Sequence, residues 1–304
     1  MASRGGEVAI ELPTLIRVYK DGTIQRLVDP PYIPPSSVPD KDTGVSSKDV
    51  VISSNVSARL YLPQAAGTRK LPVLVYYHGG GFLIESAFSA VHHPVLNRLA
   101  AACGALTVSV EYRKAPEHLL PAAYDDCWEA LRWVTEPTQR DPWLAEHGDF
   151  GRVFVGGDSS GGNIVHNIVM RVGREGLPGE LTLVGAFLTH PYFFGSEPIG
   201  SEPKHGFEQT LHYRCWNFVY PDAPGGINNP MISPMAAGAP SLVTLGCRRL
   251  FVGVAGEDEI RDRGVWYYEA VKDSGWEGEI ELFEIEGEGH AHQVLRPILI
   301  MPRR

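Results

Sequence analysis

Short apolar runs alternate with longer segments of helical periodicity over most of the chain. The runs have the length and composition of buried strands and lie at residues 73–77, 106–112, 153–156, 183–190, 250–255 and 280–285. The segments between them show the apolar spacing of helices and lie at residues 94–103, 122–135, 163–174 and 263–274. This alternation predicts an α/β fold with a mostly parallel central sheet and helices on both faces. The length of 304 residues favours a single domain over 1–304.

Three segments depart from this alternation. Residues 45–62 predict two strands, at 49–52 and 58–62, around a turn at 53–55. The residues up to about Asp42 contain several prolines, which predict extended or loop-like chain. Residues 193–242 are rich in proline, glycine and aromatic side chains and interrupt the strand–helix order.

Composition and charge argue against several classes of partner. The net charge is −9, whereas nucleic-acid binding and docking to anionic lipid both need a basic surface. No apolar run approaches the length of a membrane span, and the first residues contain no signal-like apolar stretch. We therefore expect a cytoplasmic protein, with the nucleus as the alternative, that binds neither nucleic acid nor membrane.

The four cysteines predict neither a metal site nor a disulfide. They form no Cys-x-x-Cys pair and have no metal-like spacing with histidine. Disulfides are also rare in the cytosol. Two of them, Cys103 and Cys127, fall in apolar helical patterns, so we predict that both are inert core residues, and we assign no role to Cys215 and Cys247.

The most informative chemistry lies at residues 157–163, Gly-Asp-Ser-Ser-Gly-Gly-Asn, which fit Gly-x-Ser-x-Gly with Ser159 at the centre. A predicted strand precedes the motif and a predicted helix follows it, which is the context of a nucleophile elbow. In such a tight turn, side chains at Gly157 and Gly161 would collide with neighbouring backbone. Because the chain has 33 glycines, an ordinary glycine-rich turn is the alternative for this motif alone.

A second glycine-rich segment, His-Gly-Gly-Gly-Phe at 78–82, follows the predicted strand 73–77. Three glycines let backbone N–H groups approach a ligand oxygen without obstruction. The negative oxygen of a tetrahedral acyl-transfer intermediate needs such donors, each contributing on the order of 3 kcal/mol. The donors we expect are the amides of Gly80, Gly81 and Ser160, and the alternative is a loop that only turns.

An acid and a base follow the serine in the chain order Ser, Asp, His that accompanies such an elbow. Asp258 comes just after the strand 250–255 and His290 just after the strand 280–285. Both therefore lie at strand ends, where open α/β sheets bind their ligands. A serine hydroxyl is a weak nucleophile, and a histidine can take its proton while a carboxylate orients the imidazole ring.

Neighbouring residues compete for these roles. Glu257, Glu259 and Asp262 are alternatives to Asp258, and His292 is the alternative to His290. We expect Asp262 instead to be the N-cap of the helix that follows it. We assign no role to the remaining histidines and expect them to pack or to lie on the surface, among them His92, His93, His166 and His190.

Several long segments resemble the plant carboxylesterases of the hormone-sensitive-lipase type, a group of α/β-hydrolases. They lie at residues 16–23, 78–82, 110–118, 121–126, 157–163, 258–264 and 289–290. The resemblance implies hydrolysis of small carboxylic esters without a metal or cofactor. It implies a catalytic triad and an oxyanion loop, formed by Ser159, Asp258 and His290 and by His78, Gly79, Gly80 and Gly81. It also implies a cap over the site, formed by residues 1–42 and about 193–242.

Other functions occur within the same group. The gibberellin receptors are similar around residues 158–163, but their catalytic histidine is replaced, whereas His290 and Gly81 are present here. Further relatives dehydrate or cyclise specialised plant metabolites, and the sequence leaves this alternative open. Aromatic side chains at 213–220 suit a partly apolar small-molecule substrate, and the alternative is that they pack the cap against the core. The sequence does not distinguish a monomer from a homodimer.

Residues 296–304 depart from the family pattern. Relatives continue into a final helix that packs beside the sheet, whereas Pro297 and Pro302 are poor residues for such a helix. We therefore expect the C-terminal helix to be missing and the loop of His290 to be less constrained. A shift of about 1 Å in a triad costs on the order of a hundredfold in rate.

Overall fold

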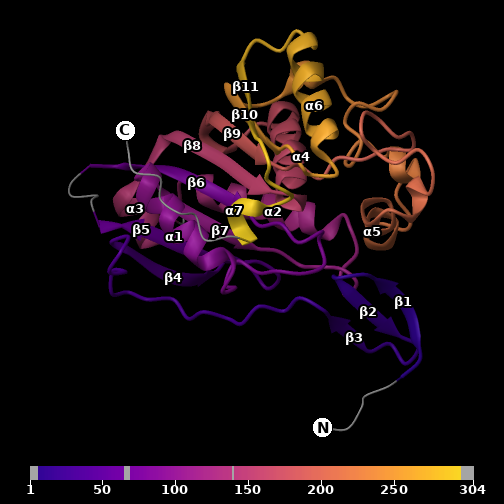
Figure 1. Cartoon of the computed structure of the whole chain (residues 1–304). Helices are drawn as coiled ribbons and strands as arrows, with labels where there is room; N and C mark the ends of the chain where they lie inside the picture. Colours follow the sequence, from indigo (N-terminus) through magenta and orange to yellow (C-terminus); the bar gives the residue numbers. More distant parts are fainter. Residues whose placement is uncertain (1–5, 65–68, 139, 296–304) are drawn as a thin grey trace.

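An eight-stranded sheet runs through the molecule with the strand order β11-β10-β9-β8-β6-β7-β5-β4 (Figure 1). The computed structural model describes residues 6–64, 69–138 and 140–295, so the expected loss of a C-terminal helix at 296–304 lies outside the described residues. The strands are β4 Val45–Val51, β5 Ser57–Pro63, β6 Leu71–Tyr77, β7 Leu106–Glu111, β8 Gly148–Asp158, β9 Leu183–Thr189, β10 Arg249–Ala255 and β11 Glu279–Ile285. From β7 to β11 all neighbouring strands are parallel, whereas β5 pairs antiparallel with β4 and β7. The predicted mostly parallel sheet is confirmed.

Helices cover both faces of this sheet. They are α1 His92–Cys103, α2 Ala122–Thr135, α3 Pro142–His147, α4 Ser160–Glu175 and α6 Arg261–Asp273. On one face, α4 packs against β8, β9 and α2, and a hydrogen bond of 3.0 Å between His166 and Tyr267 joins it to α6. On the other face, α1 packs its apolar residues against Tyr61 and Tyr76 in a second, smaller core. The two cores follow from the alternation of side chains along each strand.

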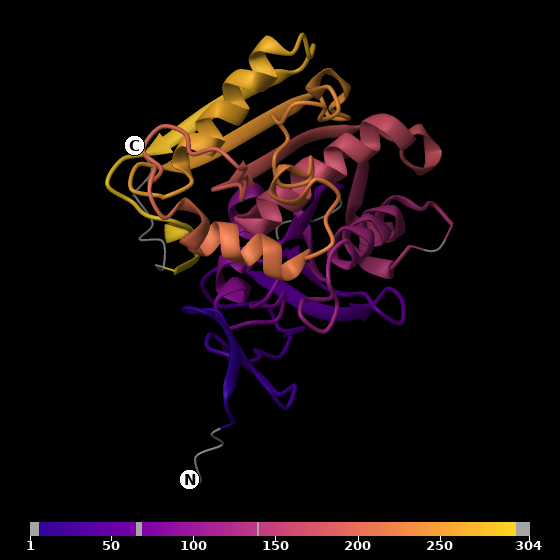
Figure 2. The same cartoon turned by 90° about the vertical axis from the view of Figure 1, so that its right-hand side faces the viewer.

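The N-terminal residues form a small sheet of their own. β1 Val8–Leu12, β2 Ile16–Tyr19 and β3 Ile24–Arg26 pair antiparallel in that order. Residues 8–26, expected as extended or loop-like chain, are extended but pair as strands, which the sequence analysis did not predict, and Leu12 and Ile16 are buried. This sheet contacts α5 Leu211–Val219, and both views show the two elements side by side (Figures 1 and 2).

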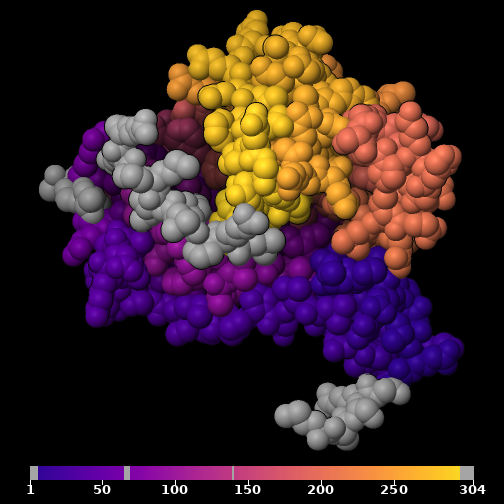
Figure 3. Space-filling model, in the orientation of Figure 1, coloured from indigo at the N-terminus to yellow at the C-terminus, as the bar shows by residue number. Residues whose placement is uncertain are grey.

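The segment 193–242 contains α5 and short turns of 3-10 helix, with no strand among its residues. A buried ion pair joins it to α6, because Arg263 donates two hydrogen bonds to the Glu202 carboxylate, at 2.7 and 2.6 Å. In the space-filling view, the C-terminal residues, in yellow, lie at the top beside the orange region of α5, and that region meets the N-terminal part, in indigo, below it (Figure 3).

Two local predictions are wrong. Asp262 is the second residue of α6 rather than its N-cap, which is Ile260. Its carboxylate accepts hydrogen bonds from the Ser201 amide and hydroxyl, at 2.6 and 2.8 Å. Cys103 ends α1 in an exposed position, whereas Cys127 is buried as predicted. Among the helices described, none has the length and apolar character needed to cross a membrane.

Candidate active site

Ser159 lies between the last residue of β8 and the first residue of α4, in the predicted strand–turn–helix context. Its backbone has φ +53°, a left-handed conformation that costs a non-glycine residue about 1–3 kcal/mol. The space around the turn is equally restricted. A Cβ at Gly161 would lie 2.0 Å from the Tyr77 carbonyl oxygen, and one at Gly157 would lie 2.6 Å from the Gly161 backbone. The predicted backbone collisions at both glycines are confirmed.

Ser159, His290 and Asp258 lie in one hydrogen-bonded row. The Nε2 atom of His290 is 2.8 Å from the Ser159 hydroxyl oxygen, and its Nδ1 atom is 2.8 Å from Asp258 Oδ2. The Ile260 amide donates to Asp258 Oδ1 at 3.1 Å. Asp258 follows β10, and His290 lies between β11 and α7 His292–Leu295, so strand ends bring three distant residues together.

The competing residues lie elsewhere. Glu257 and Glu259 are exposed, and the Asp262 carboxylate is held by Ser201 and Arg261. Among the carboxylates of the described residues, only that of Asp258 makes an ion pair with His290. The Nδ1 atom of His292 faces the Gly289 carbonyl oxygen at 3.3 Å, so it does not take the place of His290 beside Ser159.

The charge state of Asp258 follows from its surroundings. Burial alone raises the pKa of this carboxyl, but the two histidines against it and the Ile260 amide outweigh burial and hold the pKa well below its usual range. The carboxyl is therefore ionised at neutral pH. Nearby, burial and then the neighbouring His290 lower the pKa of His212 to about 4, so His212 is uncharged at neutral pH.

In the glycine-rich loop after β6, His78 and Gly79 pack against neighbouring residues, whereas Gly80 and Gly81 face the cavity beside Ser159. His78 is fully buried, stacks on Tyr112 at 4.3 Å between ring centroids, and has its pKa lowered to about 4, mainly by burial. The Gly79 amide donates to Asp158 Oδ1 at 3.0 Å, which leaves it no role as a donor to a ligand. Gly80 and Gly81, with φ of +112° and +63°, line a cavity together with Ser159.

Two histidines to which the sequence analysis assigns no role contact carboxylates of this site: His92 contacts Asp158, and His190 contacts Asp258. His92 is buried between Asp158, 3.4 Å from its Nε2 atom, and Glu85, 3.1 Å from its Nδ1 atom. These two carboxylates outweigh the effect of burial and raise the pKa of His92 to about 9. No signal in the sequence links His92 to Asp158, because the contact joins an early helix to the elbow.

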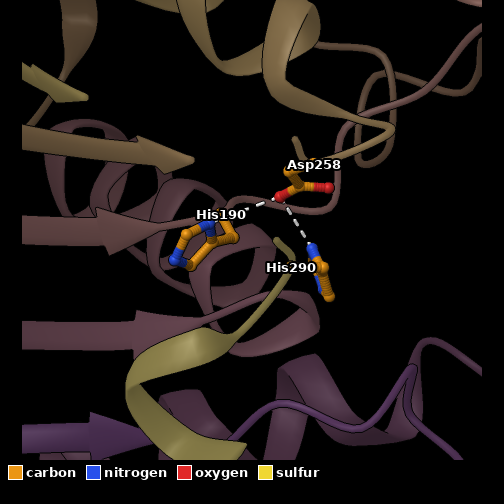
Figure 4. A group of neighbouring side chains, drawn as sticks. All are labelled: His190, Asp258 and His290. Atoms are coloured by element: carbon orange, nitrogen blue, oxygen red, sulfur yellow. Dashed lines mark hydrogen bonds and ion pairs between the residues drawn. The ribbon is translucent and has the colours of Figure 1, made fainter. Parts of the chain in front are cut away.

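His190 is the second residue missed. It follows β9 directly, and its Nδ1 atom lies 3.3 Å from Asp258 Oδ2 (Figure 4). The strand-end rule that selects Asp258 and His290 applies equally to His190. The sequence therefore contained a usable signal for this residue.

The cavity beside Ser159 has a volume of about 350 Å³ and mostly apolar walls. Both segments that the family resemblance implies as a cap contribute to it, with Thr14, Leu15 and Val28 from one and Leu211, His212 and Cys215 from the other. Its remaining apolar lining includes Ile84, Val91, Tyr192 and Val294.

The fold agrees with the comparisons to known proteins. A family model described as the alpha/beta hydrolase fold matches residues 74–294. The chain belongs to this family. It is 56% identical over 301 residues to a 2-hydroxyisoflavanone dehydratase of Glycyrrhiza echinata, covering 96% of the chain and 92% of the relative. It is 41% identical to the probable carboxylesterase 7 of Arabidopsis thaliana, covering 95% of the chain and 93% of that relative.

These relatives confirm the resemblance to the plant, hormone-sensitive-lipase-like α/β-hydrolases. Among solved structures, a thermostable esterase from Pseudomonas putida superposes with a TM-score of 0.71, over 88% of this chain and 81% of the esterase. At 24% identity, that likeness supports the fold alone. The chain is thus an enzyme of the α/β-hydrolase superfamily, and its relatives include both a dehydratase and a carboxylesterase.

Proposed function

We propose that this enzyme is a serine carboxylesterase that hydrolyses small, partly apolar esters with Ser159, His290 and Asp258 as its triad. One observation carries the proposal. The Ser159 hydroxyl, raised on a turn with φ +53°, is 2.8 Å from His290 Nε2. A serine hydroxyl that lines a cavity and pairs with an oriented imidazole is the arrangement that makes serine a nucleophile.

In the proposed reaction, the Ser159 oxygen attacks the ester carbonyl carbon while His290 Nε2 takes the hydroxyl proton. The ionised Asp258 stabilises the imidazolium that results. The amides of Gly80, Gly81 and Ser160 donate hydrogen bonds to the negative carbonyl oxygen. His290 then gives its proton to the departing alcohol, which leaves an acyl-enzyme on Ser159. Water, deprotonated by His290, releases the acid.

The cavity supports the choice of substrate. A volume of about 350 Å³ with mostly apolar walls suits a small acyl or alcohol group rather than a long lipid chain. We propose that residues 6–42 and 193–242 act as the cap, because both segments line this cavity. We also propose the cytoplasm as the compartment, which a fluorescent fusion would test.

A second candidate function rests on the identity of 56% to a dehydratase. Elimination of water from a hydroxylated substrate needs a base, for which His290 is available, but it needs no acyl-enzyme. Loss of the Ser159 hydroxyl would therefore abolish ester hydrolysis and leave much of an elimination reaction intact.

Turnover of p-nitrophenyl butyrate and of 2-hydroxyisoflavanone by the purified enzyme, beside Ser159→Ala and His290→Ala, tests both candidates. The esterase proposal predicts ester turnover that falls by roughly 10⁴-fold or more in each variant. Folded protein without ester turnover would contradict it. Conversion of 2-hydroxyisoflavanone that survives Ser159→Ala but not His290→Ala would establish the dehydratase instead.

A further inference from the structure

His190 is buried between the acid of the proposed triad and a glutamine of α7. Its Nδ1 atom lies 3.3 Å from Asp258 Oδ2, and its Nε2 atom lies 2.8 Å from Gln293 Oε1. Figure 4 shows the His190 and His290 rings on either side of the Asp258 carboxylate, with His190 at the end of its strand. The mechanism proposed above uses Asp258 and His290 but not His190.

A chain of hydrogen bonds determines which nitrogen of His190 carries its proton. The Thr189 hydroxyl donates its one hydrogen to the Gly157 carbonyl oxygen at 3.2 Å, so its oxygen must accept from the Gln293 amide nitrogen at 3.1 Å. This orients the Gln293 carbonyl oxygen toward His190 Nε2, which donates to it. In a neutral imidazole, the Nδ1 atom then carries the lone pair.

That lone pair faces a carboxylate oxygen. His190 Nδ1 is buried, and it has no hydrogen-bond partner within the described part of the chain, although Asp258 Oδ2 is close by. Two acceptors at this distance in a buried place repel each other unless a positive charge lies between them. The buried nitrogen therefore points to a positive charge beside Asp258, either a proton on His190 Nδ1 or a metal ion.

We propose that His190, Asp258 and His290 form an inhibitory site for Zn²⁺ or a similar transition-metal ion. One ligand atom from each residue lies within 4.8 Å of the other two. Imidazole nitrogen and carboxylate oxygen are ligands that zinc prefers, at about 2.0–2.2 Å, whereas Mg²⁺ prefers oxygen alone. The hydrogen bond from His190 Nε2 to Gln293 supplies the outer contact that orients a ligating histidine.

Access to this site leads through the cavity. The His290 side chain is 34% exposed, while those of Asp258 and His190 are almost fully buried behind it. An ion that enters along His290 would displace the proton between His290 Nδ1 and Asp258 Oδ2, which are 2.8 Å apart. That proton passes to solvent, and the ion takes its place among three ligands.

Zinc in this position would switch off the reaction, an effect that rests on the proposed role of His290. A neutral imidazole that binds zinc through Nδ1 must carry its proton on Nε2. His290 Nε2 would then donate to the Ser159 hydroxyl oxygen instead of accepting its proton. Ester hydrolysis and elimination through this histidine would both stop, and a chelator would restore them.

Zinc binding to the folded Ser159→Ala enzyme, measured by calorimetry, tests the site independently of activity. We expect one zinc per chain, with an affinity that falls by about tenfold or more in Ser159→Ala/His190→Gln. Ser159→Ala/His205→Gln removes an exposed histidine of segment 193–242 and should bind as tightly as the parent. Absence of zinc binding, or equal affinity with and without His190, would overturn the site and would leave a proton as the cation between His190 and Asp258.

A second variant keeps the test decisive if His190→Gln destabilises the enzyme. His290→Gln changes a partly exposed side chain and should weaken zinc binding by a similar factor. In the wild-type enzyme, zinc should inhibit ester turnover reversibly while Mg²⁺ has no effect. Zinc binding that requires His190 and His290 but leaves a measurable ester turnover unchanged would overturn the inhibitory role and, with it, the assignment of His290 as base.

Discussion

Replacing His92 with glutamine should flatten the pH dependence of stability above pH 6.5. Burial by itself lowers the pKa of His92, but the Asp158 and Glu85 carboxylates, 3.4 and 3.1 Å from its two ring nitrogens, raise it from 6.5 to about 9. Each pKa unit corresponds to about 1.4 kcal/mol, so the charged ring contributes on the order of 3 kcal/mol to folding. Because the folded pKa exceeds the unfolded one, this contribution is complete below pH 6.5 and is lost as the pH rises through 9.

Urea denaturation at about pH 6 and about pH 9.5 measures this contribution through the free energy of unfolding. From about pH 6 to about pH 9.5, the free energy of unfolding of the wild-type enzyme should fall by on the order of 3 kcal/mol more than that of His92→Gln, because the glutamine amide does not titrate. His205→Gln, which changes an exposed histidine, should keep the wild-type dependence. Parallel pH dependences in the wild type and His92→Gln would refute the reasoning, because another group would then cause the loss.

Two further substitutions test the Arg263–Glu202 ion pair, which joins segment 193–242 to α6, and the nucleophile elbow at Ser159. Glu202→Gln leaves the buried Arg263 guanidinium without its anion and should lower the free energy of unfolding by about 3–5 kcal/mol in urea. Glu208→Gln changes an exposed residue of the same segment and should lower the free energy of unfolding by less than about 0.5 kcal/mol. Equal losses in Glu202→Gln and Glu208→Gln would contradict a stabilising role for the buried ion pair. Gly161→Ala places a Cβ 2.0 Å from the Tyr77 carbonyl oxygen, so steady-state kinetics should show about a hundredfold lower kcat. A wild-type kcat would mean that the elbow tolerates movement.

The central sheet could be predicted from the sequence because its inner strands are buried on both sides. Runs such as 73–77 and 250–255 are almost wholly apolar, and the helices between them separate them clearly. The row of Ser159, Asp258 and His290 could be predicted for a related reason. Parallel strands end at one edge of the sheet, so residues just after them meet without any knowledge of packing.

The contacts that sequence reasoning missed depend on packing between distant elements. His92 meets Asp158 only because the first residue of α1 packs against the end of β8, and neither residue has a local pattern that marks the pair. Another reason explains why the small sheet at 8–26 was not predicted from the sequence. Its strands are short, and one face of β1 leaves Val8 and Ile10 exposed, so the burial signal is weak beside the prolines that follow.

Mass spectrometry of the enzyme quenched during turnover of p-nitrophenyl acetate tests the central claim most directly. The account predicts an acetyl group on the peptide that contains Ser159, absent in Ser159→Ala, because hydrolysis passes through an acyl-enzyme. Slower deacylation than acylation would also give a burst of p-nitrophenol before the steady state. Turnover with the acetyl group on another residue, or turnover that persists in Ser159→Ala, would contradict the proposed mechanism.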